Sequence, residues 1–365
     1  MTSQPSKSPE PDRAHSGEAP MTGDDRLAKV PERLNELLEH GEISAEAFAE
    51  YSATADAARL SSLLSGAHMH SAAPTRFVEV DGIRFAYRRF GDPVGTPIVL
   101  LQHFMGSLDT YDPAITDTLA AGREVILTDN AGVGLSTGVA PTTVAGMARD
   151  AASLIEALGL ERVDLLGFSM GGYVAQQITV DRPELVRRLI LVGTGPRGGE
   201  GMAQLAPDTA PLFGKVYEPQ DLMWLPIFFS PSDASQAAGR RYLERIRARR
   251  EDRDVPVSEA TVAAHSAAAR EWGAAAPGSF DYLAGIDPTT LVVNGSNDIV
   301  IPTVNSYILQ QNLPNAELIL FPDSNHGSHF QFTEQFNRYA IDFLDRSPRM
   351  FPNTREGDKH GFDAN

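Results

Sequence analysis

The sequence predicts an α/β fold in which helices cover both faces of a mostly parallel central sheet. Two observations predict it: short segments that are apolar at consecutive positions, and helical stretches between most of them. Strands buried on both faces have this continuous apolar character, and strand–helix alternation is typical of a parallel sheet. The expected parallel strands are residues 98–102, 124–129, 163–168, 189–193, 290–295 and 317–321. The expected helices are residues 113–121, 142–158, 171–181, 303–312 and 332–344.

An antiparallel hairpin is expected to precede the first parallel strand. Residues 76–80 and 83–90 alternate between apolar and polar side chains, and Asp81-Gly82 lies between them. This dipeptide favours the tight turn of a β-hairpin. We therefore place the start of the core at residue 74 and expect the core to comprise 74–196 and 285–347.

The long interval 197–284 separates two predicted strands and contains no strand pattern of its own. It holds the apolar segment 223–229 and a basic helical pattern at 240–250, RRYLERIRARR. Because a basic run of this kind is usually a solvated helix face, Glu244 and Glu251 are its expected ionic partners. We interpret the interval as a helical cap inserted into the core.

Both ends of the chain are expected to lie outside the core. Residues 1–22 are rich in Pro, Ser and charge and predict a disordered tail, and Met21 is an alternative start. Residues 23–73 show two apolar helical patterns and a linker, which predict a helical hairpin. Its apolar face needs a partner, so we expect it to pack on the same chain or to form a homodimer. Residues 348–365 are expected to be a loose tail.

Composition and charge narrow the classes of function. The chain has 365 residues, no cysteine and a formal net charge of −17. The missing cysteines exclude disulfides and thiolate metal sites, and the negative charge argues against nucleic-acid binding. No apolar run reaches the length of a membrane span, and the N-terminus has no secretory pattern. We expect a cytoplasmic protein with a small-molecule substrate and no membrane partner.

Two serines share the pattern G-x-S-x-G, and their surroundings separate them. Ser169 directly follows a predicted strand and precedes a helix that starts at Gly171. A nucleophilic serine needs such a sharp strand-to-helix turn. Ser136 lies in a glycine-rich loop that Pro141 follows, so we expect its hydroxyl to stabilise its own turn. Ser169 is therefore the candidate nucleophile.

Two later strands end in side chains that could complete a triad with Ser169. Asp298 follows strand 290–295, and His326 follows strand 317–321. The carboxyl ends of parallel strands meet at one edge of a sheet, where ligands bind in open α/β sheets. His329 is an alternative base that we expect at the surface or capping the final helix. Asp323 is an alternative acid, but it shares a short loop with His326.

Five motifs occur in a single order along the chain and point to a known family. They are HFMGS (103–107), DNAGVGLS (129–136), GFSMGG (167–172), NGSNDIVIP (294–302) and SNHG (324–327). Together they resemble the α/β-hydrolase fold superfamily over residues 76–346.

The resemblance implies a role for each candidate residue. Ser169 would be the nucleophile, His326 the general base and then acid, and Asp298 the group that orients the imidazole. The backbone N–H groups of Phe104 and Met170 would form the oxyanion hole. Phe104 stands where the family pattern His-Gly-x-x-Gly has its first glycine, which is a departure that affects the shape of the pocket. No metal and no organic cofactor are expected.

The sequence thus predicts a serine hydrolase that cleaves a carboxylic ester, lactone or thioester through an acyl-serine intermediate. One alternative is a cofactor-free peroxidase, oxygenase or lyase on the same fold. A second alternative is a non-catalytic binding protein, although that class would be expected to lose the triad. The expected substrate contacts are His103, Tyr111, Trp224 and Phe228.

Overall fold

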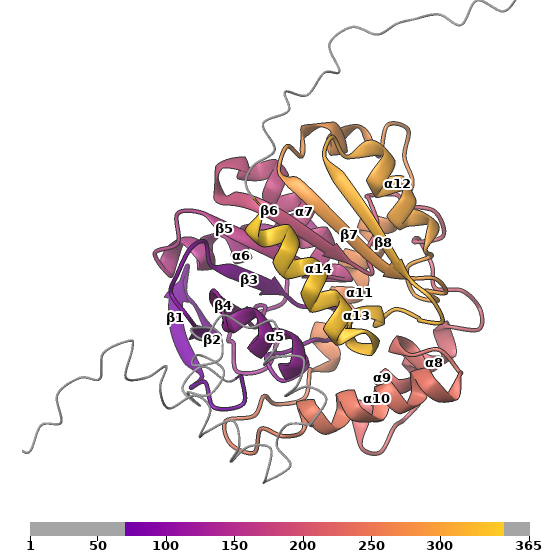
Figure 1. The fold of residues 1–365 in the computed structure, drawn as a ribbon, viewed down its shortest axis with the longest axis horizontal. Coiled ribbons are helices and arrows are strands. Elements are labelled where there is room, and N and C mark those ends of the chain that lie inside the picture. The colour runs from indigo at the N-terminus through magenta and orange to yellow at the C-terminus, as the bar shows by residue number, and fades with distance from the viewer. Residues whose placement is uncertain (1–69, 347–365) are drawn as a thin grey trace, which may run out of the picture. The chain divides into compact units, whose positions relative to one another are not determined.

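The computed structural model describes residues 70–346, which contain one eight-stranded sheet (Figure 1). Along the sheet the strand order is β1-β2-β4-β3-β5-β6-β7-β8. Strand β2 pairs antiparallel with both β1 and β4, and every other pair is parallel. The strands are β1 (Arg76–Val80), β2 (Ile83–Gly91), β3 (Ile98–Leu101), β4 (Glu124–Thr128), β5 (Val163–Phe168), β6 (Val186–Val192), β7 (Thr289–Gly295) and β8 (Ala316–Phe321). The prediction of a mostly parallel sheet that begins with a hairpin is confirmed.

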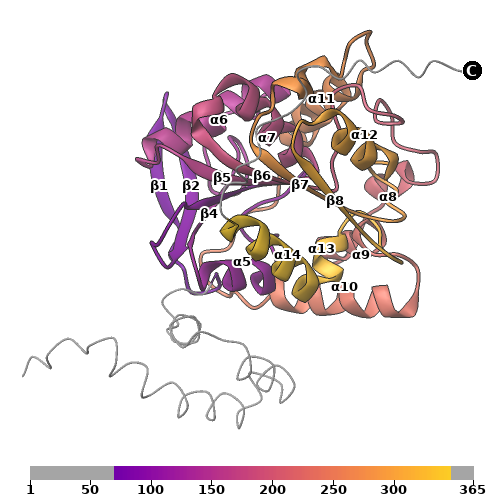
Figure 2. The same cartoon turned by 45° about the horizontal axis from the view of Figure 1, so that its top comes forward.

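Helices cover both faces of this sheet, as predicted (Figure 2). On one face lie α5 (Pro113–Ala120) and α14 (Thr333–Asp345), and on the other α6 (Val144–Ala157), α7 (Met170–Asp181) and α12 (Val304–Asn312). Strand side chains alternate between the two layers. In β3, Ile98 and Leu100 join the α5 layer, whereas Val99 and Leu101 join the α7 layer. These strands therefore have continuous apolar sequences because both of their faces are buried.

Strand β8 differs from the expectation of a buried strand. Only its last residue, Phe321, is buried, and Leu320 is 46% exposed. The reason is that β8 is the last strand of the sheet and pairs only with β7.

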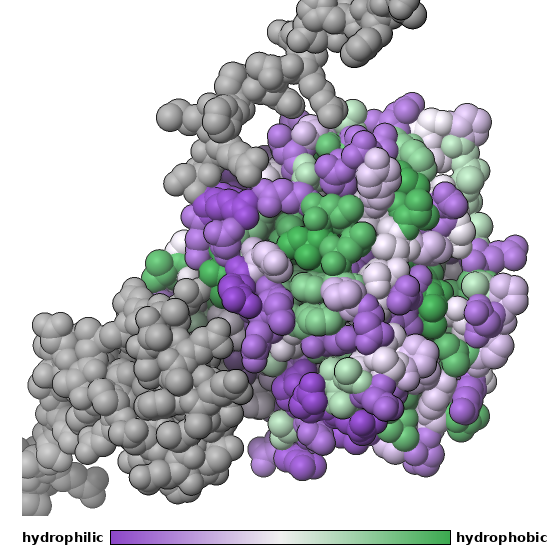
Figure 3. Space-filling model, turned by 45° about the vertical axis from the view of Figure 1, so that its right-hand side comes forward, coloured by the Kyte–Doolittle hydropathy of each residue, from purple (hydrophilic) through white to green (hydrophobic). Residues whose placement is uncertain are grey.

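On the face shown in Figure 3, apolar patches are interrupted by polar side chains.

The segment between β6 and β7 is helical and spreads over both layers of the fold. It contains α8 (Ala210–Gly214), α9 (Trp224–Phe228), α10 (Asp233–Ile246) and α11 (Glu259–Gly273), with one 3₁₀ turn before α9 and another after α11. Side chains of α9 and α10 belong to the core cluster of α5 and α14. Helix α11 instead contributes Ala268 and Trp272 to the cluster of α6 and α7. We call residues 197–284 the insertion; it links the two sides of the sheet instead of forming one separate lid.

The arginines of the basic run bind carboxylates of other segments, both in the core and within the insertion. Arg245 makes two hydrogen bonds to the buried carboxylate of Asp112, at 2.7 and 2.5 Å. Asp112 also accepts the N–H of Ala114 and thereby caps α5. Arg247 pairs in the same way with Asp221. Among the described residues no ion pair joins Glu244 or Glu251 to this run, although Glu244 raises the pKa of Arg245; the arginines pair with carboxylates of other segments instead.

Three predicted segments lie outside the described residues. They are the tail 1–22, almost all of the hairpin and linker 23–73, and the C-terminal tail 348–365. The expected homodimer through the hairpin stays a prediction. Among residues 70–346, no helix has the length and apolar character needed to cross a lipid bilayer.

Candidate active site

Ser169 lies at a sharp turn between β5 and α7. Its φ of 55° and ψ of −120° are strained for a residue with a side chain. Three hydrogen bonds hold the turn: Ser169 N–H donates to Val192 O at 2.8 Å, and Ser169 O accepts at 2.8 Å from both Gly172 N–H and the Thr194 hydroxyl. The surrounding structure therefore fixes this strained conformation.

The glycines beside Ser169 allow strand, helix and loop to approach closely. A Cβ atom at Gly171 would lie 2.2 Å from the carbonyl oxygen of Leu101, and one at Gly167 would lie 2.4 Å from the oxygen of Gly171. Gly172 packs on the side chain of Thr194 in the same way. These contacts, with backbone at Gly167 and Gly171 and with a side chain at Gly172, leave no room for a methyl group.

Gly171→Ala is therefore expected to lower the melting temperature by roughly 5 °C, because forced overpacking costs about 1–3 kcal/mol. The matched control is Gly122→Ala, since a Cβ atom at Gly122 would meet no atom within 4 Å. Thermal unfolding followed by circular dichroism measures both. Equal melting temperatures for the two variants would show that the loop at Leu101 can move away freely.

The structure brings the three predicted triad side chains together. His326 Nε2 lies 2.8 Å from Ser169 Oγ, and His326 Nδ1 lies 2.9 Å from Asp298 Oδ2. Ser169 is 5% exposed and His326 2%. Asp298 Oδ1 accepts the N–H groups of Val300 and Ile301 at 2.8 and 3.0 Å. A carboxylate facing Nδ1 favours a proton on Nδ1, which leaves Nε2 free to accept the serine proton.

The side chain of Asn325 connects the two loops that carry Asp298 and His326. Its amide oxygen accepts the N–H of His326 at 2.9 Å and that of Ile299 at 2.8 Å. Its amide nitrogen donates to Pro226 O in the insertion at 3.5 Å. Asn325 thus ties the loop of Asp298 to the loop of His326. Sequence reasoning assigned it no role, since the link depends on loops 26 residues apart.

The two backbone N–H groups that the sequence predicts as oxyanion donors, those of Met170 and Phe104, have no hydrogen-bond acceptor among the described residues. Met170 is the first residue of α7, so its N–H has no intrahelical acceptor. Within residues 70–346, no hydrogen bond from the N–H of Phe104 occurs either. We call residues 103–107 the oxyanion loop after the role predicted for them from the sequence. The Nδ1 of His103 lies 2.9 Å from Phe104 O, an acceptor, and this contact helps to hold the loop. Burial lowers the pKa of His103 to about 3, so the ring is neutral.

Three of the four predicted substrate contacts form an aromatic cluster beside the triad. The Phe168 ring contacts His103 and Phe228 edge-on, and its centroid lies 5.0 Å from that of His326. Trp224 stacks on Phe228 at 4.7 Å and meets His103 edge-on. The fourth, Tyr111, is buried, and its hydroxyl donates to Leu101 O at 2.8 Å. The hydroxyl of Tyr111 is therefore engaged with the backbone.

The rejected candidates have other partners. The hydroxyl of Ser136 accepts the N–H of Ala86 at 2.8 Å and bonds Asp129 O, so it ties its loop to β2. Asp323 accepts hydrogen bonds from Ser230 and Ser232, at 2.7 and 2.5 Å. The hydroxyl groups of these serines lower the pKa of Asp323.

His329 is not the surface or capping residue expected from the sequence. It lies in the short helix α13 (Ser328–Gln331), is completely buried, and contacts the rings of Phe168, Phe330 and Phe336. Within the described residues, neither ring nitrogen has a hydrogen-bond partner. Burial lowers the pKa of His329 well below its usual value, and the nearby His326 and His103 contribute in the same direction.

His329→Leu is expected to stabilise the protein, and more at acidic pH. The pKa of His329 is lower in the folded than in the unfolded chain, so below about pH 6.5 only the unfolded state gains a proton there. The wild type then loses up to about 1.4 kcal/mol of stability per pH unit relative to the leucine variant. Urea unfolding of both proteins at pH 7.5, 6.0 and 5.0 measures the difference. A difference that does not change with pH would contradict the buried, neutral imidazole.

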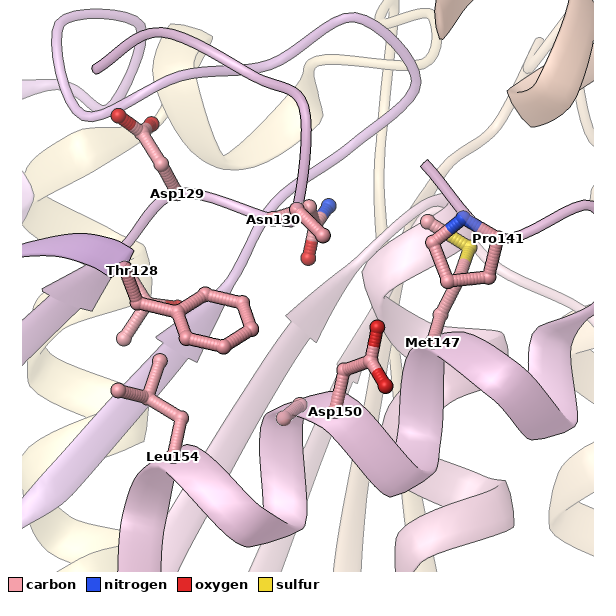
Figure 4. A pocket seen from close by; sticks show the side chains of 10 residues that line it. Thr128, Asp129, Asn130, Pro141, Met147, Asp150 and Leu154 are labelled. Atoms are coloured by element: carbon pink, nitrogen blue, oxygen red, sulfur yellow. The ribbon is translucent and has the colours of Figure 1, made fainter. Parts of the chain in front are cut away.

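A separate hollow lies beside β4 and is not part of this site. Its lining includes Thr128 at the end of β4, Asp129 and Asn130 directly after it, and Met147 and Asp150 on α6 (Figure 4). Its volume of about 10 Å³ suits one water molecule. None of the triad residues line it.

Comparisons with known proteins agree with this geometry. A model of the alpha/beta hydrolase fold family matches residues 96–333. An alpha/beta hydrolase fold protein from Chitinophaga pinensis is 40% identical, with a TM-score of 0.72 over 77% of this chain and 100% of that one. The 2-hydroxy-6-oxononadienedioate/2-hydroxy-6-oxononatrienedioate hydrolase 2 of Pseudomonas putida is 27% identical over 72% of this chain and 92% of its own length. The structure of Est816, described as an N-acyl homoserine lactone degrading enzyme, is 26% identical, with a TM-score of 0.56 over 73% of this chain and 100% of that one. These similarities support a hydrolase.

Proposed function

The chain belongs to the α/β-hydrolase fold family, and on that premise we propose that it is a serine hydrolase that cleaves a carboxylic ester or lactone through an acyl-serine intermediate. The observation that carries the proposal is the continuous hydrogen-bonded chain from Ser169 Oγ through His326 to Asp298, with distances of 2.8 and 2.9 Å. A serine hydroxyl is a weak nucleophile, and a hydrogen-bonded base with its own orienting carboxylate activates it.

The reaction follows from these positions. Ser169 Oγ attacks the substrate carbonyl carbon while its proton moves to His326 Nε2. The carbonyl oxygen becomes an oxyanion and accepts the N–H groups of Phe104 and Met170, each contributing about 3 kcal/mol to stabilisation of the transition state. The C–O bond to the leaving group breaks, and His326 protonates the departing oxygen. Water then attacks the acyl-serine with His326 as base, which releases the acid and restores Ser169.

The aromatic cluster beside the triad supports an apolar acyl group. Trp224 and Phe228 come from α9 of the insertion, and the Phe228 ring lies 6.0 Å from that of His326. We propose that Trp224, Phe228 and His103 contact the acyl part of the substrate. The engaged hydroxyl of Tyr111 leaves only its ring for such a contact.

A fluorophosphonate probe tests the proposal directly, since it labels only an activated serine. We expect one probe per chain in intact-mass spectra, with the modified peptide containing Ser169, and no labelling after Ser169→Ala. A folded wild-type protein that takes up no probe would favour the non-catalytic alternative. Turnover that depends on peroxide or oxygen would favour the cofactor-free oxidative alternative.

A second candidate function is hydrolysis of a carbon–carbon bond, and the relative from Pseudomonas putida favours it. The 2-hydroxy-6-oxononadienedioate in its name contains no ester, so hydrolysis of that compound breaks a bond between carbons. The same triad could act if the substrate places a ketone carbonyl at Ser169 and the leaving carbon can be protonated. A vinylogous 1,5-diketone acid and p-nitrophenyl butyrate, assayed side by side, distinguish the two candidates by their kcat/KM.

A further inference from the structure

His265 is a buried histidine of the insertion that touches the oxyanion loop. It lies on α11, its exposed fraction is 0%, and its ring centroid is 5.9 Å from that of Phe104. Its Nδ1 accepts the N–H of Met105 in a long hydrogen bond of 3.4 Å. Met105 has a positive φ of 62°, so this bond helps to hold the loop in an unusual conformation. Helix α11 thereby reaches the segment that we propose as the source of an oxyanion donor.

The contacts of His265 determine where its proton lies. Burial lowers the pKa of His265 to about 4, so the ring is neutral at pH 7. Because Nδ1 accepts a hydrogen bond, the single ring proton is on Nε2. Within the described residues, Nε2 is buried and has no hydrogen-bond partner. A buried N–H donor without an acceptor is rare in native proteins and calls for an explanation.

Among the described residues, the buried histidines His103, His265 and His329 each have at least one ring nitrogen without a hydrogen-bond partner, and the surroundings of His265 differ from those of His329. His329 lies among phenylalanine rings and makes no hydrogen bond. His265 is anchored on one side by the oxyanion loop and carries its free donor on the other side of the same ring. Met105, whose N–H binds the ring, directly follows Phe104, and the Phe104 ring contacts that of His265. The imidazole of His265 therefore touches the residue that we propose as an oxyanion donor and the residue that follows it.

We infer that the Nε2–H of His265 is a specificity-determining donor for a second oxygen atom that the substrate carries a few bonds from its scissile carbonyl. This inference rests on the proposed function, which places that carbonyl beside Ser169 and the oxyanion loop. The substrate class is an acyl compound with a keto, enol, hydroxyl or ether oxygen, in preference to a plain alkanoyl compound. A neutral N–H donates to such an oxygen, whereas a methylene group at the same place leaves the donor unpaired.

Two substitutions separate this role from the anchoring of the loop. His265→Asn keeps an acceptor near the Nδ1 position for the N–H of Met105 and removes the Nε2 donor. His265→Gln keeps an amide donor near the Nε2 position and removes the acceptor for Met105. The substrates are matched p-nitrophenyl esters, pentanoate against 3-methoxypropanoate, in which an oxygen replaces a methylene group. Comparing each variant with the wild type on the same ester cancels the difference in intrinsic reactivity.

For His265→Asn we expect kcat/KM to fall about tenfold or more on the methoxy ester and less than threefold on pentanoate. His265→Gln should retain the preference for the methoxy ester while lowering kcat on both esters. An equal loss on both esters in His265→Asn, or no loss on either, would overturn the inference.

Product binding tests the inference without turnover. Calorimetric titration of Ser169→Ala with 3-methoxypropanoate and pentanoate should show the same discrimination, and adding His265→Asn should abolish it. Equal affinities for the two acids in Ser169→Ala would overturn the inference even if esterase activity is present. If the proposed function is wrong, the result is different. The wild type then shows, on either ester, no activity that is lost in Ser169→Ala.

Discussion

Replacing Ser169 by alanine is expected to lower kcat for p-nitrophenyl butyrate by about 10⁴- to 10⁶-fold. The alanine variant retains the free N–H groups of Phe104 and Met170 and the covering insertion, so substrate binding should change little. What it loses is the oxygen 2.8 Å from His326 Nε2, and with it the acyl-serine route. Initial rates under saturating ester, measured against a buffer blank, give the ratio.

Ser136→Ala is the matched control for this result, because both serines lie in G-x-S-x-G pentapeptides. Among residues 70–346, the hydroxyl of Ser136 bonds to the backbone of Ala86 and Asp129 and to no side chain. We expect kcat within threefold of the wild type and a stability loss of about 1 kcal/mol from the missing hydrogen bonds. A Ser169→Ala protein that keeps more than a tenth of the wild-type kcat would refute the nucleophile assignment.

The sheet could be predicted because the sequence of a strand reflects how many of its faces are buried. A segment such as residues 163–168 is apolar at almost every position only if both of its faces are covered, and in the structure β5 is buried throughout. Asp164 is the one charged residue within β5. It is buried as well, and its carboxylate accepts hydrogen bonds from the guanidinium of Arg187. The exposed β8 shows the limit of this reasoning: its sequence is apolar like the others, and its position at the edge depends on strand order, which no local pattern contains.

The path of the insertion could not be predicted for a related reason. Its helices have clear start signals, such as Ser232 and Ser258, which cap α10 and α11. Which layer each helix joins is decided by contacts far along the chain, for example the ion pair of Arg245 with Asp112 across 133 residues. A basic helix face looks solvated in sequence even when its arginines bind buried carboxylates.

Within the site, the residues that directly follow a strand could be identified from the sequence. The residues that act only through hydrogen bonds between loops could not. Ser169, Asp298 and His326 each follow a strand end, so parallel topology alone brings them to one edge. Asn325 and His265 act through hydrogen bonds to other loops, at Ile299 and Met105. Histidine and asparagine occur in many structural settings, so their residue types carried no signal without the coordinates.

Asp298→Asn is expected to lower kcat by about 10⁴-fold while leaving the fold intact, and the hydrogen bonds of the wild type explain why. Asp298 Oδ1 accepts two backbone N–H groups, from Val300 and Ile301, and Oδ2 faces His326 Nδ1. In asparagine only the amide oxygen can satisfy the two N–H groups. The amide NH₂ must then face Nδ1, which becomes an acceptor, and the ring proton moves to Nε2. A protonated Nε2 cannot take the proton of Ser169, so the general base is lost.

Two measurements check this argument, and a neighbouring carboxylate provides the control. Nitrogen-15 NMR of the ring of His326 should show the proton on Nδ1 in the wild type and on Nε2 in Asp298→Asn. Asp323→Asn changes a carboxylate three residues from His326 that bonds Ser230 and Ser232, and it should keep kcat within about tenfold. If Asp298→Asn kept a kcat like that of Asp323→Asn, the carboxylate would not set the tautomer. Ser169 would then have to be activated by His326 without an orienting acid.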